Sequence, residues 1–285
     1  MFVPRKILEE KLLRLLAEDV GQGDATSEAV VPCGLKTTAE IIAKTGGVVA
    51  GVEEATILAE ALGLKVDSTA VDGSVVKSGQ VFMRIQGDAK TILAVERTLL
   101  NLLSRMSGIA TATRALTEKL RKANLPSKIA ATRKTAPGLL FFDKKAVSIG
   151  GGDAHRLHLD DMVLIKDNHI ALAGSLETAV KRAKQNVSFS KKIEVEVENP
   201  EDALRVAELG ADMVMLDNFS PQQAKEAVRL LKKGGFFGRV ILEASGGITP
   251  QNLLEFASAG VDVISLGELT HSVKSLDISL EITRA

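Results

Sequence analysis

This sequence has one cysteine, no tryptophan and no tyrosine, and its charges balance, with 36 Lys and Arg against 36 Asp and Glu. The single cysteine, Cys33, excludes an intramolecular disulfide and a metal site built from several thiolates. The fold therefore gains no disulfide stabilisation from an oxidising compartment. Zero net charge and 3% aromatic residues provide neither the positive field nor the stacking surfaces that nucleic-acid binding needs. We therefore expect a cytoplasmic protein without a nucleic-acid partner.

Long apolar runs are also missing. No window approaches the roughly 20 apolar residues of a membrane span, and residues 1–18 interleave charged side chains with leucine where a signal peptide needs an unbroken apolar stretch. We expect no membrane partner. The chain of 285 residues, 45% of them hydrophobic, is long enough for one large domain or two ordinary ones.

The first part of the chain predicts a mixed α/β domain. Residues 36–86 hold short runs rich in β-branched side chains broken by glycines, and residues 91–123 show helical spacing with one interruption at Ser107-Gly108. We place the domain boundary at this interruption, which gives an N-terminal α/β sandwich domain over residues 1–107. The tail, residues 272–285, contains a stretch that alternates with a period of two, and we expect it to return to this domain as an edge strand.

The second part, residues 108–271, alternates strand-like and helical segments, with helices expected from Pro200, Pro221 and Pro250. Strand, helix and strand repeated in this way imply parallel pairing through right-handed crossovers. An α/β barrel is the natural solution, with six strands identifiable and one or two more possible in irregular segments. The six strand-like runs are residues 128–132, 162–165, 193–197, 213–216, 240–243 and 261–266.

Polar residues stand at the carboxyl ends of the predicted strands. Successive positions are about one strand–helix unit apart, so the chain returns each time to the same rim of the barrel. Such barrels place their sites at this rim because the loops after the strands and the amino ends of the helices open there. The polar residues are Arg133 and Lys134, Lys166, Glu196, Asp217, Ser245 and Gly246, and Gly267.

One half of this predicted site is cationic. Arg133, Lys134, His155, Arg156 and Lys166 bring like charges together, which proteins tolerate mainly where an anionic ligand neutralises them. We expect a small polyanion that carries carboxylates or phosphates. The histidines in the same stretch of sequence could instead hold a metal, but the neighbouring Arg156 and Lys166 would repel a cation.

The other half of the predicted site is acidic. Glu196 and Asp217 end neighbouring strands and offer the hard oxygen ligands that Mg²⁺ takes beside substrate phosphates. Glu194 and Glu198 lie on the same strand face as Glu196, so the pattern alone does not select Glu196.

A glycine turn follows the strand that ends at Ser245 and Gly246, and a helix is expected to start near Pro250. Free backbone N–H groups and the helix dipole at such a start attract phosphate. Gly267 ends the next strand and completes a pair of late-barrel loops that often bind phosphate.

Three motifs in this region resemble the quinolinate phosphoribosyltransferase family, also called carboxylating nicotinate-nucleotide pyrophosphorylase. They are residues 132–138 (TRKTAPG), 150–156 (GGGDAHR) and 164–170 (LIKDNHI). The likeness continues in order along almost the whole chain, which makes it far more specific than any one short motif. Two departures occur, because Ala154 stands where the family usually has Asn and His158 where it usually has Gly.

The resemblance implies a two-domain enzyme with an incomplete, seven-stranded α/β barrel, working as a homodimer or higher oligomer with sites between subunits. Its substrates would be quinolinate and phosphoribosyl pyrophosphate with Mg²⁺, and its products nicotinate mononucleotide, pyrophosphate and CO₂, on the way to NAD. No organic cofactor is required, because the quaternised ring nitrogen stabilises the carbanion left by decarboxylation.

The resemblance also implies a role for each of these residues. The quinolinate-binding group comprises Arg133, His155, Arg156 and Lys166, with Arg97 reaching across from the partner subunit. Glu196 and Asp217 would lie near the ribose and the metal, and Ser245, Gly246 and Gly267 would cradle phosphate. The catalytic group comprises Lys134, Lys166, Glu196 and Asp217. Whether Lys166, Lys134 or His155 assists decarboxylation stays open.

Three other hypotheses are compatible with the sequence. A ModD-like homologue of the same fold, associated with molybdenum transport, is disfavoured by the unbroken cationic set. Lys166 at a strand end could form a Schiff base in an aldolase-like lyase, with Arg156 and Lys134 as neighbouring charges. A nonenzymatic barrel could bind a phosphorylated metabolite without turnover.

Overall fold

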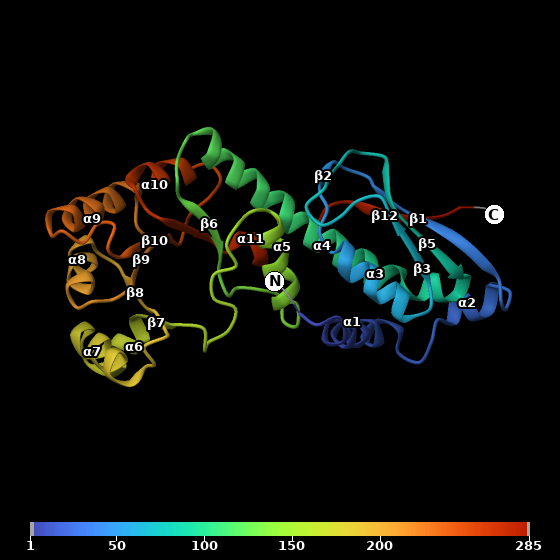
Figure 1. The fold of residues 1–285 in the computed structure, drawn as a ribbon, viewed down its shortest axis with the longest axis horizontal. Helices are drawn as coiled ribbons and strands as arrows, with labels where there is room; N and C mark the ends of the chain where they lie inside the picture. The colour runs from blue at the N-terminus through green and yellow to red at the C-terminus, as the bar shows by residue number, and fades with distance from the viewer. Residues whose placement is uncertain (1–2, 284–285) are drawn as a thin grey trace. The chain divides into compact units, whose positions relative to one another are not determined.

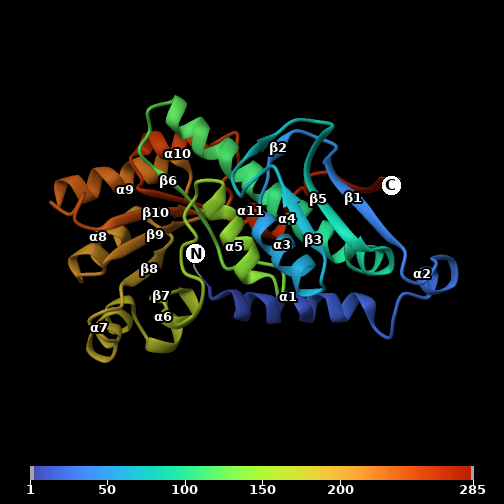
Figure 2. The same cartoon turned by 45° about the vertical axis from the view of Figure 1, so that its right-hand side comes forward.

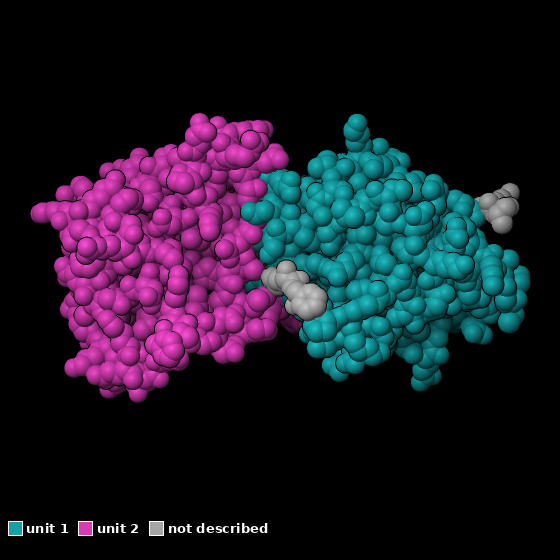
Figure 3. Space-filling model, viewed as in Figure 1, with its two compact units in different colours: residues 1–114, 141–151, 273–285 teal, residues 115–140, 152–272 magenta. Residues whose placement is uncertain are grey.

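The chain forms two compact units, which Figure 3 colours separately. The computed structural model describes residues 3–283. Within them, unit 1 comprises residues 3–114, 141–151 and 273–283, and unit 2 comprises residues 115–140 and 152–272. The domain boundary expected after residue 107 falls inside a continuous helix, and residues 141–151, expected in the barrel domain, belong to unit 1.

Unit 1 combines an antiparallel sheet with helices. Its elements are α1 (Arg5–Val20), α2 (Ala25–Val30), β1 (Lys36–Ala43), β2 (Gly47–Val48), α3 (Val52–Ala61), β3 (Lys65–Ser68), β4 (Val75–Val76), β5 (Gln80–Asp88), α4 (Ala89–Lys122, which continues into unit 2), α5 (Leu140–Ile149) and β12 (Ile278–Thr283). The sheet has the order β12-β1-β5-β3 (Figure 1). Strand β2 pairs with β4 in a separate two-stranded sheet.

The tail returns to unit 1 as an edge strand. β12 pairs antiparallel with β1, and Thr283 lies opposite Thr38. The alternation of the tail sequence buries Ile278, whereas Glu281 stays exposed and pairs with Lys44 at 2.6 Å. Ile282, on the same side of the strand as Ile278, is 46% exposed, so only the start of the strand has a buried side.

Helix α4 runs without a break through the Ser107-Gly108 step that was predicted to interrupt it. A Cβ atom on Gly108 would lie 2.3 Å from the carbonyl oxygen of Lys274 and 2.9 Å from Cα of Ser275, so the tail passes directly over this turn of the helix. Ser107 Oγ accepts a hydrogen bond from the N–H of Ala50 at 3.0 Å. Both residues therefore serve the packing of unit 1, and the glycine marks a close approach and not a turn.

Unit 2 is a parallel α/β fold. Its elements are β6 (Lys128–Ala131), β7 (Val163–Ile165), α6 (Asp167–Ala173), α7 (Leu176–Asn186), β8 (Ile193–Val197), α8 (Pro200–Glu208), β9 (Met213–Asp217), α9 (Pro221–Lys233), β10 (Ile241–Ser245), α10 (Leu253–Ala259), β11 (Val263–Leu266) and α11 (Glu268–His271). The strands pair in the order β6-β11-β10-β9-β8-β7, and α8, α9 and α10 lie outside the sheet in both views (Figures 1 and 2). The predicted α/β fold class and the six predicted strands are confirmed.

The resemblance predicts seven barrel strands, and the described chain has six. A seventh segment contributes a single parallel bridge, between Asp153 and Ala130 of β6. It follows a run of three glycines in which Gly151 has φ +92°, a backbone conformation that does not continue as an extended strand. Over the described residues, the sheet therefore runs from β6 to β7 without closing, as an incomplete barrel.

The helices of unit 2 cover strands that are buried almost along their whole length. Val195, Val214 and Leu242 are at most 1% exposed. Helices cover one face of the parallel sheet and side chains fill the other, so neither face is exposed to solvent. Helices α8 and α9 begin as predicted, at Pro200 and Pro221, each after a capping side chain. Over residues 3–283, no helix has both the length and the apolar character to cross a membrane.

We expect Gly108→Ala to lower the free energy of unfolding by about 2 kcal/mol, because overpacking against backbone outweighs the helix propensity of about 1 kcal/mol that alanine gains. Urea unfolding followed by far-ultraviolet circular dichroism measures this change. Asn101→Ala, at an exposed position on the same helix, is the control and should change stability little. An unaltered unfolding midpoint for Gly108→Ala would contradict the close approach of the tail.

Candidate active site

The inner face of the parallel sheet carries two layers of side chains. Strand side chains alternate between faces, so residues two apart on one strand point the same way. The rim layer, at the strand ends, consists of Arg133, Lys166, Glu196, Asp217 and Ser245. The inner layer lies two residues earlier on the same strands and consists of Ala131, Leu164, Glu194, Met215 and Glu243, to which β11 adds Ser265.

One cavity of about 320 Å³ opens at this rim. It is lined by the whole rim layer, by the inner layer apart from Glu194, and by four loop residues: Thr132, Lys134, His155 and Arg156. The cationic and the acidic residues that the sequence divides into two halves therefore share one enclosure.

Three predicted site residues do not line this cavity. Gly246 has φ +85°, and a Cβ atom there would lie 2.3 Å from Oδ1 of Asn218, so only glycine fits between these neighbouring strand ends. A Cβ atom on Gly267 would lie 3.0 Å from the ring of His271. Arg97 is exposed on α4, in unit 1.

The turn after β10 leads into a helix, as predicted near Pro250. Helix α10 is assigned from Leu253, and the residues just before it already form a helical turn, because the N–H of Leu253 donates to the carbonyl oxygen of Thr249 at 3.1 Å. Oδ1 of Asn252 accepts from the N–H of Thr249 at 2.8 Å, as in a capping box. Gly246 and the glycine after it both have positive φ, so a phosphate there would meet the N–H groups of the turn that precedes this helix.

Arg133, Lys134 and Arg156 line the cavity and form no ion pair with any residue from 3 to 283. Burial, and next the like charge of Arg133, lower the pKa of Arg156. The two guanidinium groups are thus close enough to repel each other. An anion placed between them relieves this repulsion, and the forked guanidinium suits a carboxylate.

Lys166 is held by the acidic side of the cavity. Its Nζ forms an ion pair with Oε2 of Glu196, and the two side chains are 42% and 12% exposed. Asp217 lies at the neighbouring strand end and accepts a hydrogen bond from Nδ2 of Asn218 at 2.7 Å. The ion pair between Lys166 and Glu196 joins residues that the sequence places in separate halves of the site. Glu196 and Asp217 together offer two carboxylates at one rim as hard oxygen donors.

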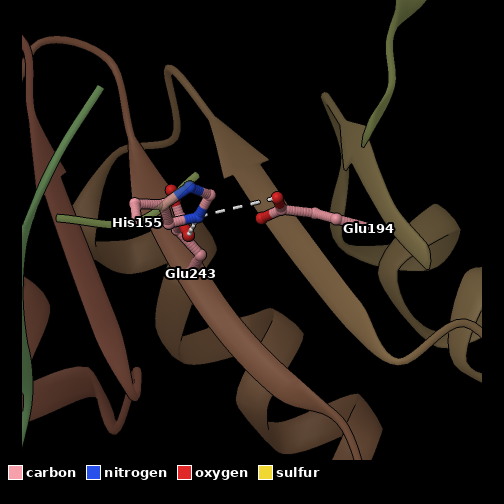
Figure 4. A group of neighbouring side chains, drawn as sticks. All are labelled: His155, Glu194 and Glu243. Atoms are coloured by element: carbon pink, nitrogen blue, oxygen red, sulfur yellow. Dashed lines mark hydrogen bonds and ion pairs between the residues drawn. The ribbon is translucent and has the colours of Figure 1, made fainter. Parts of the chain in front are cut away.

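Sequence reasoning missed a buried cluster of acids around His155. The side chains of Glu194 and Glu243 are 0% and 1% exposed, and both carboxylates face the His155 ring (Figure 4). Nε2 of His155 lies 2.9 Å from Oε2 of Glu243 and 3.7 Å from Oε2 of Glu194. Burial, and next the charge of Glu243, raise the pKa of Glu194 to about 9. The sequence signal for these two acids is their spacing. Glu194 lies two residues before Glu196 and Glu243 two residues before Ser245, so each points to the same face of its strand as a predicted site residue.

The other histidines of this stretch have structural partners. Nδ1 of His169 accepts from the backbone N–H of Lys166 at 3.0 Å, which caps α6. The backbone N–H of His158 donates to Oδ2 of Asp161 at 2.9 Å. As far as residues 3–283 show, only His155 of these three joins a group of side chains that could hold a metal.

An incomplete α/β barrel whose rim gathers unpaired arginines and carboxylates in one cavity defines an enzyme that acts on small anionic substrates. Residues 24–107 match the N-terminal domain of quinolinate phosphoribosyl transferase, and residues 109–281 match its C-terminal domain. The chain belongs to the quinolinate phosphoribosyltransferase family, as the motifs predict.

Individual relatives resemble the chain over nearly its full length. A probable nicotinate-nucleotide pyrophosphorylase (carboxylating) of Methanothermobacter thermautotrophicus is 49% identical over 268 residues, 94% of this chain and 96% of the relative. One from Bacillus subtilis is 41% identical over 281 residues, 97% of this chain and 93% of the relative. The crystal structure of NadC from Streptococcus pyogenes has a TM-score of 0.90 at 35% identity and covers 99% of both chains. The likeness thus includes both units.

We expect Glu194→Gln to stabilise the protein relative to wild type by an amount that grows between about pH 5 and about pH 8. The buried carboxyl keeps its proton when folded and loses it when unfolded, so the wild type loses stability as pH rises through this window, whereas glutamine does not titrate. Urea unfolding in buffer with a chelator measures the difference.

Glu198→Gln is the control, because Glu198 is exposed just past the same strand. A stability difference between Glu194→Gln and wild type that stays constant across this pH range would contradict the raised pKa.

Proposed function

We propose that this chain transfers the phosphoribosyl group of phosphoribosyl pyrophosphate to quinolinate with loss of CO₂, which yields nicotinate mononucleotide and pyrophosphate for NAD biosynthesis. Membership of the family supports this reaction. The observation that carries it is the rim cavity, in which Arg133 and Arg156, without ion-pair partners among the described residues, share one enclosure with Glu196 and Asp217.

The cationic wall of the cavity binds the dicarboxylate. Arg133 and Arg156 present forked donors that match carboxylates, and Lys134 adds a point charge. Quinolinate carries two adjacent carboxylates on one ring, so it neutralises both arginines at once. His155 lines the same wall and completes the set.

Glu196 and Asp217 would hold Mg²⁺ together with phosphate oxygens of the substrate. They fit this role because both are carboxylates at neighbouring strand ends and Glu196 already binds a cation, the Lys166 ammonium. When bound, Mg²⁺ stabilises the charge that develops on the departing pyrophosphate. Ser245 and the glycine turn after it offer hydroxyl and N–H donors to a phosphate.

The first step forms a bond from the pyridine nitrogen to the anomeric carbon while the bond from that carbon to pyrophosphate breaks. Positive charge develops on the ribose in the transition state, and the carboxylates of Glu196 and Asp217 stabilise it. The arginines hold quinolinate in line, so positioning supplies much of the rate.

The second step breaks the bond between C2 and its carboxylate, which leaves as CO₂. The electron pair stays on C2, where the adjacent positive ring nitrogen stabilises it, until C2 takes up a proton. Lys134, His155 and Lys166 line the cavity and are the candidate donors of this proton.

We propose further that the enzyme is a homodimer or a larger oligomer in which Arg97 of one subunit reaches the site of another. Arg97 is exposed on α4, and its guanidinium forms no ion pair within residues 3–283. A third arginine from the partner adds a further cation for the quinolinate carboxylates.

A Schiff-base lyase is the less favoured alternative. Lys166 is paired with Glu196 and its side chain is 42% exposed, whereas a nucleophilic lysine needs a desolvated, uncharged amine. A ModD-like role is also less favoured, because Arg133, His155 and Arg156 are all present in one cavity.

The protein incubated with quinolinate, phosphoribosyl pyrophosphate and Mg²⁺ should release nicotinate mononucleotide and CO₂ in equal amounts, and a chelator should stop the reaction. Chromatography of the nucleotide measures the product. Binding of phosphoribosyl pyrophosphate without product at any pH would reject the proposal in favour of a binding protein.

In the same assay, Arg133→Ala should raise the KM for quinolinate about tenfold or more. Ser245→Ala should raise the KM for phosphoribosyl pyrophosphate by a similar factor.

Arg182→Ala is the control for these two variants, because Arg182 is exposed on α7. Circular dichroism should show all three folded. Equal effects of Arg133→Ala on both KM values would contradict the separate binding of the two substrates.

At a quinolinate concentration far below the KM, Arg97→Ala and Arg133→Ala should each lose most of the wild-type activity. We expect the two chains to regain about a quarter of it when they are unfolded together and refolded as a random mixture. In a mixed dimer, one of the two sites then receives both wild-type arginines. The regained activity measures sharing of the site. A mixture as inactive as its components would show that Arg97 acts within its own subunit or not at all.

A further inference from the structure

Half of the inner layer of the barrel is polar, although barrel interiors are normally filled with branched apolar side chains. Glu243 and Ser265 are 1% and 3% exposed, and both lie at the floor of the cavity. Burying such groups is unfavourable unless they are hydrogen-bonded. The reaction described above assigns no role to either residue, so their place beneath the substrate requires another reason.

A hydrogen-bonded chain leads from this inner layer to the cavity wall. Ser265 Oγ donates to Oε1 of Glu243 at 2.5 Å, and Oε2 of Glu243 lies 2.9 Å from Nε2 of His155. Ser265 and Glu243 stand on the paired strands β11 and β10, so the sheet fixes their separation. Both carboxylate oxygens are engaged, which fixes the plane of the carboxylate that receives the Nε2–H group.

The backbone of His155 is held independently of its ring. His155 has φ +52°, a left-handed conformation that a residue other than glycine keeps only where its surroundings impose it. Its N–H donates to Oδ1 of Asp153 at 2.7 Å, and Asp153 is bridged to Ala130 of β6. The loop therefore fixes the position of the imidazole, and the ring contacts Glu243 there.

We propose that Glu243 and Ser265 are positioning residues that fix the ring of His155 in the cavity wall, with Nε2–H directed to the barrel interior and the rest of the ring available to a bound dicarboxylate. Glu194, 3.7 Å from Nε2, lies at the same edge of the ring as Glu243. The contacts stand on the structure alone, whereas the identity of the ligand rests on the proposed function.

The first test uses the protein without substrates. Nitrogen-15 spectra of histidine-labelled protein should show a His155 ring protonated at Nε2, assigned by the signals that His155→Ala removes. Glu243→Gln and Ser265→Ala should shift these signals with circular dichroism unchanged, and Ser265→Thr, which keeps the hydroxyl, should restore them. Identical His155 signals in wild type and Glu243→Gln would overturn the proposal.

The second test separates positioning from a general structural role. His155→Ala and Glu243→Gln should each raise the KM for quinolinate about tenfold, with little change in the KM for phosphoribosyl pyrophosphate. Combined in one chain, they should be no worse than His155→Ala alone, because Glu243 acts through the ring. Effects that multiply would overturn the proposal.

Leu242→Met is the control, since Leu242 is buried on the opposite face of the same strand and the change nearly conserves volume. A wild type without turnover would refute the proposed function, and the nitrogen-15 spectra would then decide the positioning role by themselves.

Discussion

Parallel pairing of the six strands in unit 2 is the constraint on which the rest of the site depends. Because all six strands run the same way, their carboxyl ends share one rim, and the period of two sends alternate side chains of each strand into one interior. Residues as distant in sequence as Arg133 and Ser245 therefore line the same cavity. The same alternation places buried polar groups beneath the rim, where Glu243 contacts the ring of His155.

Charge is paired in one part of the cavity and not in another. Lys166 is paired with Glu196, whereas Arg133, Lys134 and Arg156 form no ion pair among the described residues. A protein tolerates unpaired, half-buried cations where a ligand supplies the missing charge. The carboxylates of quinolinate would do so, and substrate binding would then relieve the repulsion between the two guanidinium groups.

Unit 1 also buries charges, and two of its buried carboxylates have a cationic partner within the unit. Arg105 forms two hydrogen bonds, of 2.7 and 2.8 Å, with the buried carboxylate of Asp143. Lys145, on the same helix α5, lies 2.7 Å from the buried carboxylate of Glu54. Removing one member of such a pair leaves an uncompensated buried charge, so these contacts hold α5 in unit 1. The contrast separates charges that serve the fold from those that await a ligand.

The sequence by itself determined the six strands, their common rim and the family, because apolar runs at regular spacing and polar strand ends are local patterns. Only the tertiary structure decided that Gly108 packs under the tail and that Glu243 meets His155. These features depend on distances between segments far apart in the chain. The sequence alone does not distinguish a glycine at a close contact from a glycine at a turn, or a buried carboxylate from an exposed one. Only the folded chain shows which neighbours each residue has.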